Sequence, residues 1–305
     1  MLRDTAVFAP VACGGGINTG KRKRVIRVGM LASAFLLVTQ VFLTGNSSER
    51  RVQSDEIAEA VQVPIIMYHS VVQSGAYSDY IIDTATLRSD LAYLREHGYE
   101  AVLVRDLIAY VHMDVELPEK PVVLTFDDGM VNNILYVLPL LEEYGMKGVF
   151  AIVGEYTERF SALDDRSPTY AYMTWKDVGE LAASGSAEIA NHSYGLHSLG
   201  NRRGSMRKSG ESAEAYTSLL ADDLARLQQA LEQNAGVLPL TFAYPYGLVS
   251  PESVPVVKEA GFYASLGCAE KGNLITKDPE CLFRLGRYNR TQQVRTQDFM
   301  ARVLG

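Results

Sequence analysis

From Pro64 onward, short apolar runs alternate with longer segments whose apolar residues recur at helical spacing. The apolar runs predict strands at residues 65–68, 122–126, 148–153, 187–190, 240–243, 264–266 and 282–285. The helical segments are residues 86–97, 131–144, 175–183, 213–233 and 251–260. Strands that alternate with helices indicate an α/β fold with a parallel sheet, and seven or eight such units indicate a (β/α) barrel.

The first part of the chain has a different pattern. A basic cluster at residues 21–27 precedes an apolar run, residues 28–44, whose one strongly polar member is Gln40. At about 1.5 Å per residue this run reaches roughly 26 Å, just enough to cross a bilayer. The basic flank predicts a cytoplasmic tail (residues 1–24), one transmembrane signal-anchor helix (residues 25–44) and an extracellular remainder in the cell membrane.

Two other interpretations of residues 25–44 stay open. The segment could be a buried helix, or a signal peptide whose cleavage releases a secreted domain. No Ala-x-Ala-like cleavage site follows the apolar run, and this favours an uncleaved anchor.

Residues 45–62 are mostly polar and predict a linker that precedes a domain at residues 63–305. Residues 1–45 contain six Lys or Arg and one Asp, so residues 46–305 carry a net charge of −12 within the −7 of the whole chain. An acidic domain is a poor nucleic-acid binder, whereas a neutral or cationic glycan is compatible with it. We expect a monomeric domain with no nucleic-acid partner.

Two adjacent carboxylates, Asp127 and Asp128, stand where the strand at residues 122–126 stops before Gly129. Side chains alternate along a strand, so the two carboxylates should diverge, and one can bind a metal while the other acts as a base. The alternative is an acidic turn that caps the helix beginning near Val131.

Two of the five histidines, His192 and His197, fall within one six-residue stretch that follows the strand at residues 187–190. A spacing of i and i+5 is poor for one face of a helix, so the two imidazoles would have to converge from a loop. Imidazole and carboxylate together suit zinc or a similar divalent ion, and three protein ligands leave an open position for hydrolysis. As a lone pair, they would be ordinary surface histidines.

Residues 242–247 form a third such segment, a strand that ends in a Pro/Gly turn whose free backbone N–H groups could face a reacting oxygen. Barrel enzymes place their active sites just after the carboxyl ends of strands. Because the Asp pair, the His pair and this turn all follow strands, the pattern predicts that they share one site.

These residues also resemble a known family. The sequences Thr-Phe-Asp-Asp-Gly at residues 125–129, His-Ser at 192–193 with His197, and Tyr-Pro-Tyr-Gly at 244–247 are similar, in that order, to the first three motifs of the polysaccharide deacetylases, the NodB-homology group of carbohydrate esterase family four. The resemblance covers about residues 63–290. It implies a distorted, NodB-like barrel that de-N-acetylates an N-acetylglucosamine-containing polysaccharide of the cell wall or outside the cell.

The resemblance assigns roles residue by residue. It implies that Asp127 is the catalytic base and that Asp128, His192 and His197 bind a divalent metal, usually zinc. In the third motif it implies that the backbone N–H of Tyr246 stabilises the oxyanion, with Tyr244 and Pro245 contributing to the oxyanion or substrate site. The histidine spacing departs from the commoner i and i+4 form and resembles the branch that acts on poly-N-acetylglucosamine.

Two departures from the family pattern concern the chemistry. The Arg usual in the third motif is replaced by Tyr244, and the late Leu-x-His that supplies the general acid is absent. We predict that His69, which follows the strand at residues 65–68, is the acid, as an early Tyr-His is in the poly-N-acetylglucosamine branch. Arg284 is the candidate partner that keeps Asp127 ionised. The alternative function is a catalytically impaired, metal-containing protein of the cell envelope that binds glycans.

The cysteines leave one question open. Cys268 and Cys281 lie in the same predicted extracellular domain and could pair, whereas Cys13 would be a cytoplasmic thiol. The sequence does not determine whether the two Cα atoms approach closely enough for a disulfide.

Overall fold

The computed structural model describes residues 60–75, 78–163 and 165–305. The predicted tail and anchor, nearly all of the predicted linker and Cys13 lie outside these residues. Within the described part of the chain, no helix combines the length and the apolar character needed to cross a membrane.

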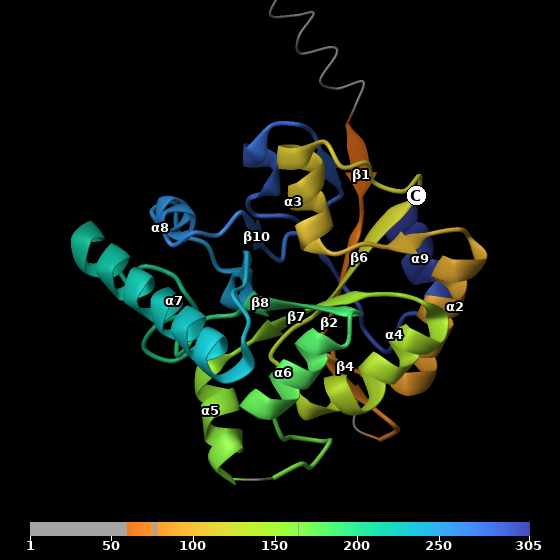
Figure 1. The fold of residues 1–305 in the computed structure, drawn as a ribbon, viewed down its shortest axis with the longest axis horizontal. Coiled ribbons are helices and arrows are strands. Elements are labelled where there is room, and N and C mark those ends of the chain that lie inside the picture. The colour runs from red at the N-terminus through yellow and green to blue at the C-terminus, as the bar shows by residue number, and fades with distance from the viewer. Residues whose placement is uncertain (1–59, 76–77, 164) are drawn as a thin grey trace, which may run out of the picture. The chain divides into compact units, whose positions relative to one another are not determined.

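A parallel sheet runs through the middle of the domain, with helices packed around it (Figure 1). Its strands, in spatial order, are β12 (Tyr288–Asn289), β2 (Ile65–Tyr68), β6 (Pro121–Phe126), β7 (Gly148–Ile152), β8 (Ala187–Asn191), β9 (Thr241–Ala243) and β10 (Ala264–Leu266), with β5 (Glu100–Ala101) beside β6. Every pairing in this sheet is parallel. The predicted α/β architecture is therefore confirmed, as a seven-strand half-barrel rather than a barrel closed by strand pairing.

Helices and short turns complete the domain. They are α2 (Thr84–Glu96), α3 (Val104–Met113), α4 (Leu138–Tyr144), α5 (Gly154–Leu163), α6 (Trp175–Ala183), α7 (Ala213–Ala235), α8 (Ser253–Glu259) and α9 (Thr296–Leu304), the π-helical turn η1 (Asn133–Val137), and the 3-10 turns η2 (Pro245–Gly247) and η3 (Pro279–Leu282). Helices α3, α5 and α9 lie in segments for which the sequence pattern predicts no helix.

Two small sheets lie outside the half-barrel. They pair β1 (Val61–Val63) with β11 (Asn273–Ile275), and β3 (Ser70–Val72) with β4 (Ile81–Asp83). Val61 and Gln62 were assigned to the linker, but they pair with Ile275 and Leu274. The folded domain therefore begins before residue 63, because a local polar pattern does not reveal a strand partner more than two hundred residues away.

Side chains alternate between two cores across the sheet. Leu124 and Phe150 pack into a cluster with residues of α2, α6 and α9, whereas Val123 and Val149 pack into a second cluster with residues of α3. The backbone N–H of Asp127 donates to the carbonyl of Tyr68 at 3.0 Å, which extends the β6–β2 ladder by one residue. A period of two therefore places Asp127 on the same face of β6 as Val123.

One segment, residues 285–290, bridges the two edges of the half-barrel. Leu285 forms an isolated parallel bridge with Leu266 of β10. The backbone N–H of Arg287 donates to the carbonyl of Ala269 at 3.0 Å, and that of Arg290 donates to the carbonyl of Met67 in β2 at 2.9 Å. This segment brings the C-terminal part of the chain next to the carboxyl end of β6.

The strand predicted at residues 282–285 is wrong. Leu282 ends η3, and Arg284 adopts a left-handed conformation with φ of 60°. Leu282 and Leu285 are nevertheless both buried in the second core. Their burial explains the apolar pattern, because a turn can deliver two leucines to a core without forming a strand.

Candidate active site

One cavity of about 380 Å³ lies where the carboxyl ends of β2, β6, β8 and β9 converge. Its lining includes predicted site residues from all four strand ends: His69, Asp127, Asp128, His192, His197 and Tyr246. The remaining lining residues are Met67, Tyr80, Leu199, Cys268, Glu270 and Asn289. The structure thus brings residues that follow four separate strands together in one cavity.

The turn after β6 separates the two carboxylates. Asp128 has φ of 75° and Gly129 has φ of 74°. The left-handed conformation costs a non-glycine residue about 1–2 kcal/mol, whereas glycine adopts it freely. This turn directs Asp128 toward the histidines and leaves Asp127 on the same face of β6 as Val123. The two carboxylates therefore diverge, as the alternation of side chains along a strand predicts.

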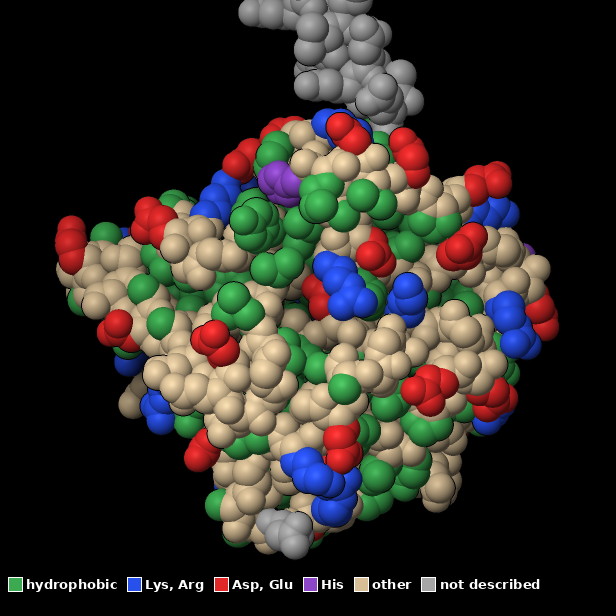
Figure 2. Space-filling view, viewed as in Figure 1, with side chains coloured by type: hydrophobic (Ala, Val, Ile, Leu, Met, Phe, Trp, Pro, Cys, Tyr) green, Lys and Arg blue, Asp and Glu red, His purple; other side chains and the backbone are tan. Residues whose placement is uncertain are grey.

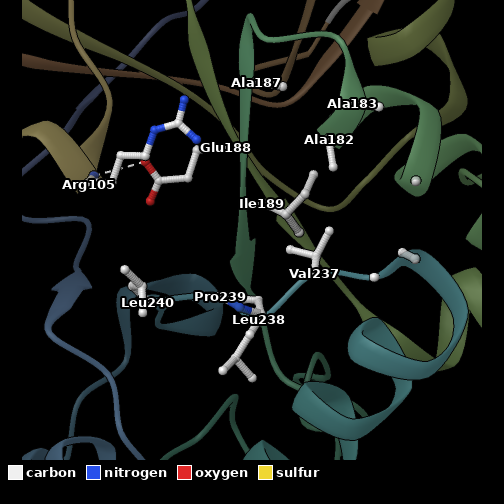
Figure 3. A pocket seen from close by; sticks show the side chains of 13 residues that line it. Arg105, Ala182, Ala183, Ala187, Glu188, Ile189, Val237, Leu238, Pro239 and Leu240 are labelled. Atoms are coloured by element: carbon white, nitrogen blue, oxygen red, sulfur yellow. Dashed lines mark hydrogen bonds between the residues drawn. The ribbon is translucent and has the colours of Figure 1, made fainter.

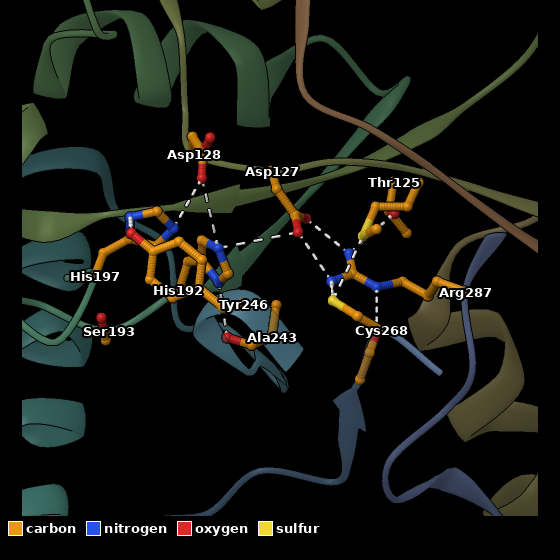
Figure 4. A network of polar contacts seen from close by, with 12 residues as sticks. Thr125, Asp127, Asp128, His192, Ser193, His197, Ala243, Tyr246, Cys268 and Arg287 are labelled. Atoms are coloured by element: carbon orange, nitrogen blue, oxygen red, sulfur yellow. Dashed lines mark hydrogen bonds and ion pairs between the residues drawn. The ribbon is translucent and has the colours of Figure 1, made fainter. Parts of the chain in front are cut away.

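Asp128, His192 and His197 form a compact group of candidate metal ligands (Figure 4). One ligand atom from each lies within 4.8 Å of the other two. The Oδ1 atom of Asp128 is 3.1 Å from Nε2 of His197 and 3.7 Å from Nε2 of His192. No other group of three or more His, Cys, Asp or Glu in the described ranges is arranged to hold a metal.

The hydrogen bonds of the two imidazoles fit a metal site. Nδ1 of His192 is 2.8 Å from the carbonyl oxygen of Ala243, so Nδ1 donates there and Nε2 is left as the ligand atom. Nδ1 of His197 is 3.3 Å from the hydroxyl of Tyr246. Burial lowers the pKa of His192 to about 4, so its imidazole is neutral at physiological pH, as a metal ligand must be.

Asp127 is paired with Arg287. The two carboxylate oxygens lie 2.7 and 2.9 Å from the two terminal nitrogens of the guanidinium, and both side chains are buried. Burial by itself would raise the pKa of Asp127, but the charge of Arg287 and the neighbouring His192 outweigh it and hold that pKa well below its usual range. Asp127 is therefore ionised at any physiological pH. Its Oδ2 atom lies 3.9 Å from Nε2 of His192.

The guanidinium beside Asp127 comes from Arg287, and the sequence-based choice of Arg284 is wrong. Arg284 is exposed and lies in the turn after η3, whereas Arg287 is fully buried, and its Nε donates to the carbonyl of Gly267 at 2.7 Å. The error follows from the misplaced last strand. The local sequence carries no signal for Arg287, because Arg284 stands between Phe283 and Leu285 and is the arginine with apolar neighbours on both sides.

Tyr244 and Pro245 do not reach the cavity, although they were predicted to contribute to the oxyanion or substrate site. The Tyr244 ring is buried, with its centroid 4.7 Å from that of Phe242, and its hydroxyl accepts a hydrogen bond from Oγ of Ser253 at 3.1 Å. Both side chains are buried. Tyr246 alone of the three lines the cavity, with a left-handed φ of 59°.

His69, which follows β2, lines the same cavity as the candidate metal ligands. Its ring lies edge-on to Tyr80, with centroids 4.8 Å apart, and its carbonyl accepts a hydrogen bond from Nδ2 of Asn133 at 3.0 Å. Its Nδ1 atom is buried without a hydrogen-bond partner. The backbone of His69 is thus held in place, while its buried Nδ1 forms no hydrogen bond within the described residues.

Cys268 and Cys281 are free thiols, which answers the question that the sequence left open. Cys268 lines the cavity, where its Sγ is 3.6 Å from a terminal nitrogen of Arg287. Cys281 instead points to the carbonyl of Thr276 at 3.7 Å. The two side chains have separate structural partners.

A second cavity, of about 460 Å³, lies at the amino end of β8 (Figure 3). Its buried acid, Glu188, accepts hydrogen bonds from the backbone N–H of Arg105, at the start of α3, at 2.9 Å and from Oγ1 of Thr241 at 3.2 Å. Burial raises the pKa of Glu188 to about 7. These contacts identify Glu188 as a cap of α3, so this cavity is not a second candidate active site.

Comparison with known proteins agrees with this geometry. Residues 114–265 match the family model described as polysaccharide deacetylase. Over 217 residues the chain is 28% identical to the poly-beta-1,6-N-acetyl-D-glucosamine N-deacetylase of Escherichia coli strain K12, and the match covers 65% of this chain and 32% of that protein. It is 25% identical over 203 residues to the protein of the same name from Staphylococcus aureus strain N315, of which 64% is covered.

The chain therefore matches about a third of the E. coli protein's length and less than two thirds of the S. aureus protein's length. A solved structure of a de-N-acetylase from Aggregatibacter actinomycetemcomitans has the same fold, with a TM-score of 0.66 and 24% sequence identity. That similarity covers 78% of this chain and all of the other one.

Proposed function

The chain belongs to the polysaccharide deacetylase family, whose members are hydrolases of non-peptide carbon–nitrogen bonds, and from this premise we propose that it de-N-acetylates a polysaccharide that contains N-acetylglucosamine. The observation that carries the proposal is the arrangement in one cavity of an Asp-His-His ligand group next to an ionised, arginine-paired Asp127. The names of the two curated relatives support a polymer of the poly-N-acetylglucosamine class.

The ligand group of Asp128, His192 and His197 fits a divalent metal. Two neutral imidazoles and one carboxylate suit zinc among the common ions, and three ligands leave room for a substrate. When bound, the ion supplies Lewis-acid polarisation of the acetyl carbonyl. Tyr246 orients His197, and the carbonyl of Ala243 orients His192, so the ligand atoms are held ready for the ion.

Asp127 takes the proton of the attacking water in this proposal. Arg287 keeps the carboxylate ionised and holds both oxygens in one plane at the cavity wall. The backbone N–H of Tyr246, on the turn after β9, donates to the developing oxyanion. His69 donates a proton to the departing amine of the sugar.

The alternative of a catalytically impaired glycan-binding protein rested on two missing family residues. Arg287 supplies the guanidinium that the third motif lacks, and His69 stands in the cavity where an acid is required. A protein that only bound glycans would have no use for a buried base paired with arginine. The geometry thus favours an active enzyme.

The surface bears on the charge of the polymer that the domain binds, and the N-terminal sequence bears on the location of the domain. On the face drawn in Figure 2, acidic and basic side chains are interspersed among hydrophobic ones, and neither charge dominates the described surface in that view. An uncharged glycan suits such a surface. In this proposal the domain acts outside the cytoplasm. It is either held at the membrane by the predicted anchor at residues 25–44 or released by cleavage of that segment, and the sequence pattern alone supports this location.

Metal removal provides the direct test of the proposed function. The full chain should release acetate from N-acetylglucosamine oligomers, lose this activity in a chelator and regain it with added Zn²⁺, because the ion polarises the bond that breaks. Acetate is quantified over time in each condition. Binding of the oligomers without acetate release would support the impaired protein, and undiminished release in the chelator would contradict the metal site.

The role of His69 is tested by a change of leaving group. His69→Ala should lower turnover of the glycan amide by about 10²–10⁴-fold, the usual contribution of a positioned proton donor, and should leave metal content unchanged. An aryl acetate departs without protonation, so its hydrolysis should fall much less. His112→Ala, at the exposed end of α3, is the matched control. Equal losses on both substrates would show that His69 supports the cavity rather than acting as the acid.

A further inference from the structure

The carboxylate of Asp223, on helix α7, holds the backbone between the two histidines. Its Oδ1 accepts a hydrogen bond from the N–H of Tyr194 at 2.8 Å, and its Oδ2 accepts one from the N–H of Gly195 at 2.8 Å. Hydrogen bonds to an ionised acceptor are roughly twice as strong as neutral ones. The middle of the loop that carries His197 is therefore fastened to a helix from another part of the chain.

The rest of this loop also depends on side chains for its shape. Ser193 adopts a left-handed φ of 72°, and its N–H donates to Oδ1 of Asn191 at 2.9 Å. Oγ of Ser193 accepts a hydrogen bond from the N–H of Leu196 at 3.2 Å. Side chains thus accept the N–H groups of four consecutive residues, 193–196, and Asp223 accepts two of the four.

A second contact from α7 supports the same loop. The guanidinium of Arg226 lies 3.7 Å from the centroid of the Tyr194 ring. The same ring packs on Gly154, where an added Cβ would be 2.5 Å from Cδ2 of Tyr194. Asp223 and Arg226 are three residues apart on one face of α7, which is anchored in the cores by Leu224 and Leu227.

We propose that Asp223 is a positioning residue that sets the distance of His197 from His192 and Asp128, and thereby controls the affinity for the divalent metal. Two ligands at i and i+5 cannot be aligned by a helix, so the loop between them needs an external support, and α7 provides it. The inference rests on the metal site of the proposed function. It assigns to α7 a role that none of the three motifs contains.

The test compares Asp223→Asn with Asp222→Asn in the full chain. Asp222 is the exposed neighbour on the same helix, and the hydrogen bonds to the N–H groups of Tyr194 and Gly195 come from Asp223, so both variants lose one negative charge at nearly the same place. The asparagine of Asp223→Asn would keep the shape of the side chain but present an amide N–H to a backbone N–H. The dissociation constant for Co²⁺ alone, followed by the absorption of the bound ion, should rise by about 10–100-fold in Asp223→Asn, as for other residues that support metal ligands.

The control and the metal-free stability decide between positioning and general structural support. Asp222→Asn should bind Co²⁺ within about twofold of wild type, as surface substitutions usually do. If Asp223→Asn has a lower melting temperature but the same Co²⁺ affinity as Asp222→Asn, Asp223 is structural only and the inference is overturned. If wild type itself binds no Co²⁺, the metal site of the proposed function fails, and the positioning role fails with it.

A second variant covers the case in which Asp223→Asn does not fold. Arg226→Gln removes the guanidinium from the Tyr194 ring and leaves both hydrogen bonds of Asp223 in place. We expect its dissociation constant for Co²⁺ to rise by about two- to fivefold, which corresponds to the loss of one exposed cation–π contact. An unchanged constant in a folded Arg226→Gln variant would contradict the idea that α7 positions His197.

Discussion

Asp127→Asn is expected to retain its metal and to lose about 10²–10⁴-fold in turnover, because an amide cannot accept the proton of the attacking water. The three candidate ligands are other residues, and the ligand atoms of Asp128, His192 and His197 already lie within 4.8 Å of one another. Metal content by elemental analysis and acetate release by the same preparation are the two measurements. Activity is compared below the melting temperature of the variant, since Arg287 loses its charged partner.

Asp128→Asn is the matched control for this prediction. It changes the adjacent carboxylate in the same way, but its Oδ1 is the atom next to both imidazoles, so it should lose metal and activity together. Loss of metal from Asp127→Asn, with metal retained in Asp128→Asn, would reverse the roles of the two residues. Full activity in Asp127→Asn would show that the base is elsewhere.

Arg287→Met is expected to lower the free energy of unfolding by about 3–5 kcal/mol, the usual cost of removing one partner from a buried ion pair. The Arg287 and Asp127 side chains are 0% and 3% exposed, so the variant removes one partner of a buried pair. Asp127 would stay buried with its charge uncompensated, and each of its oxygens would lose the hydrogen bond from Arg287. Urea or thermal unfolding of the metal-free protein at neutral pH measures the effect.

Two further variants sharpen this prediction. Arg284→Met is the matched control, because Arg284 is exposed and three residues away, and it should change stability by no more than about 0.5 kcal/mol. The double variant Asp127→Asn with Arg287→Met should cost less than the two single variants added together, because each removes the penalty that the other creates. Additive losses, or a loss in Arg284→Met as large as in Arg287→Met, would argue against the buried pair.

The sequence by itself determined the order of six of the parallel strands and of the helices α2, α4, α6, α7 and α8, together with the residues that stand at the strand ends. Alternating apolar runs and helical patterns predicted the parallel strands β2, β6, β8, β9 and β10 close to where they occur, because a strand buried on both faces has a continuous apolar sequence. Asp127 and Asp128 were recognisable for a local reason. A period of two followed by a glycine turn separates neighbouring side chains wherever it occurs.

The sequence predicted that His192 and His197 converge, but it did not show which residue holds the loop between them. Their spacing excluded a helix, and the position of both after β8 placed them at the carboxyl end of the sheet. What holds the loop at that spacing is Asp223 on α7, twenty-eight residues beyond Gly195 along the chain. A side chain that caps a loop from so far away leaves no periodic trace in the sequence.

Only the tertiary structure decided which arginine meets Asp127. Arg287 is 160 residues away from it, and the two meet because residues 285–290 bridge both edges of the half-barrel. Tertiary packing likewise determined that Tyr244 is buried in a core and that Cys268 and Cys281 stay unpaired. Local pattern determines which face of a strand a residue occupies, whereas the partner across that face depends on how distant segments pack, and no spacing along the chain specifies it.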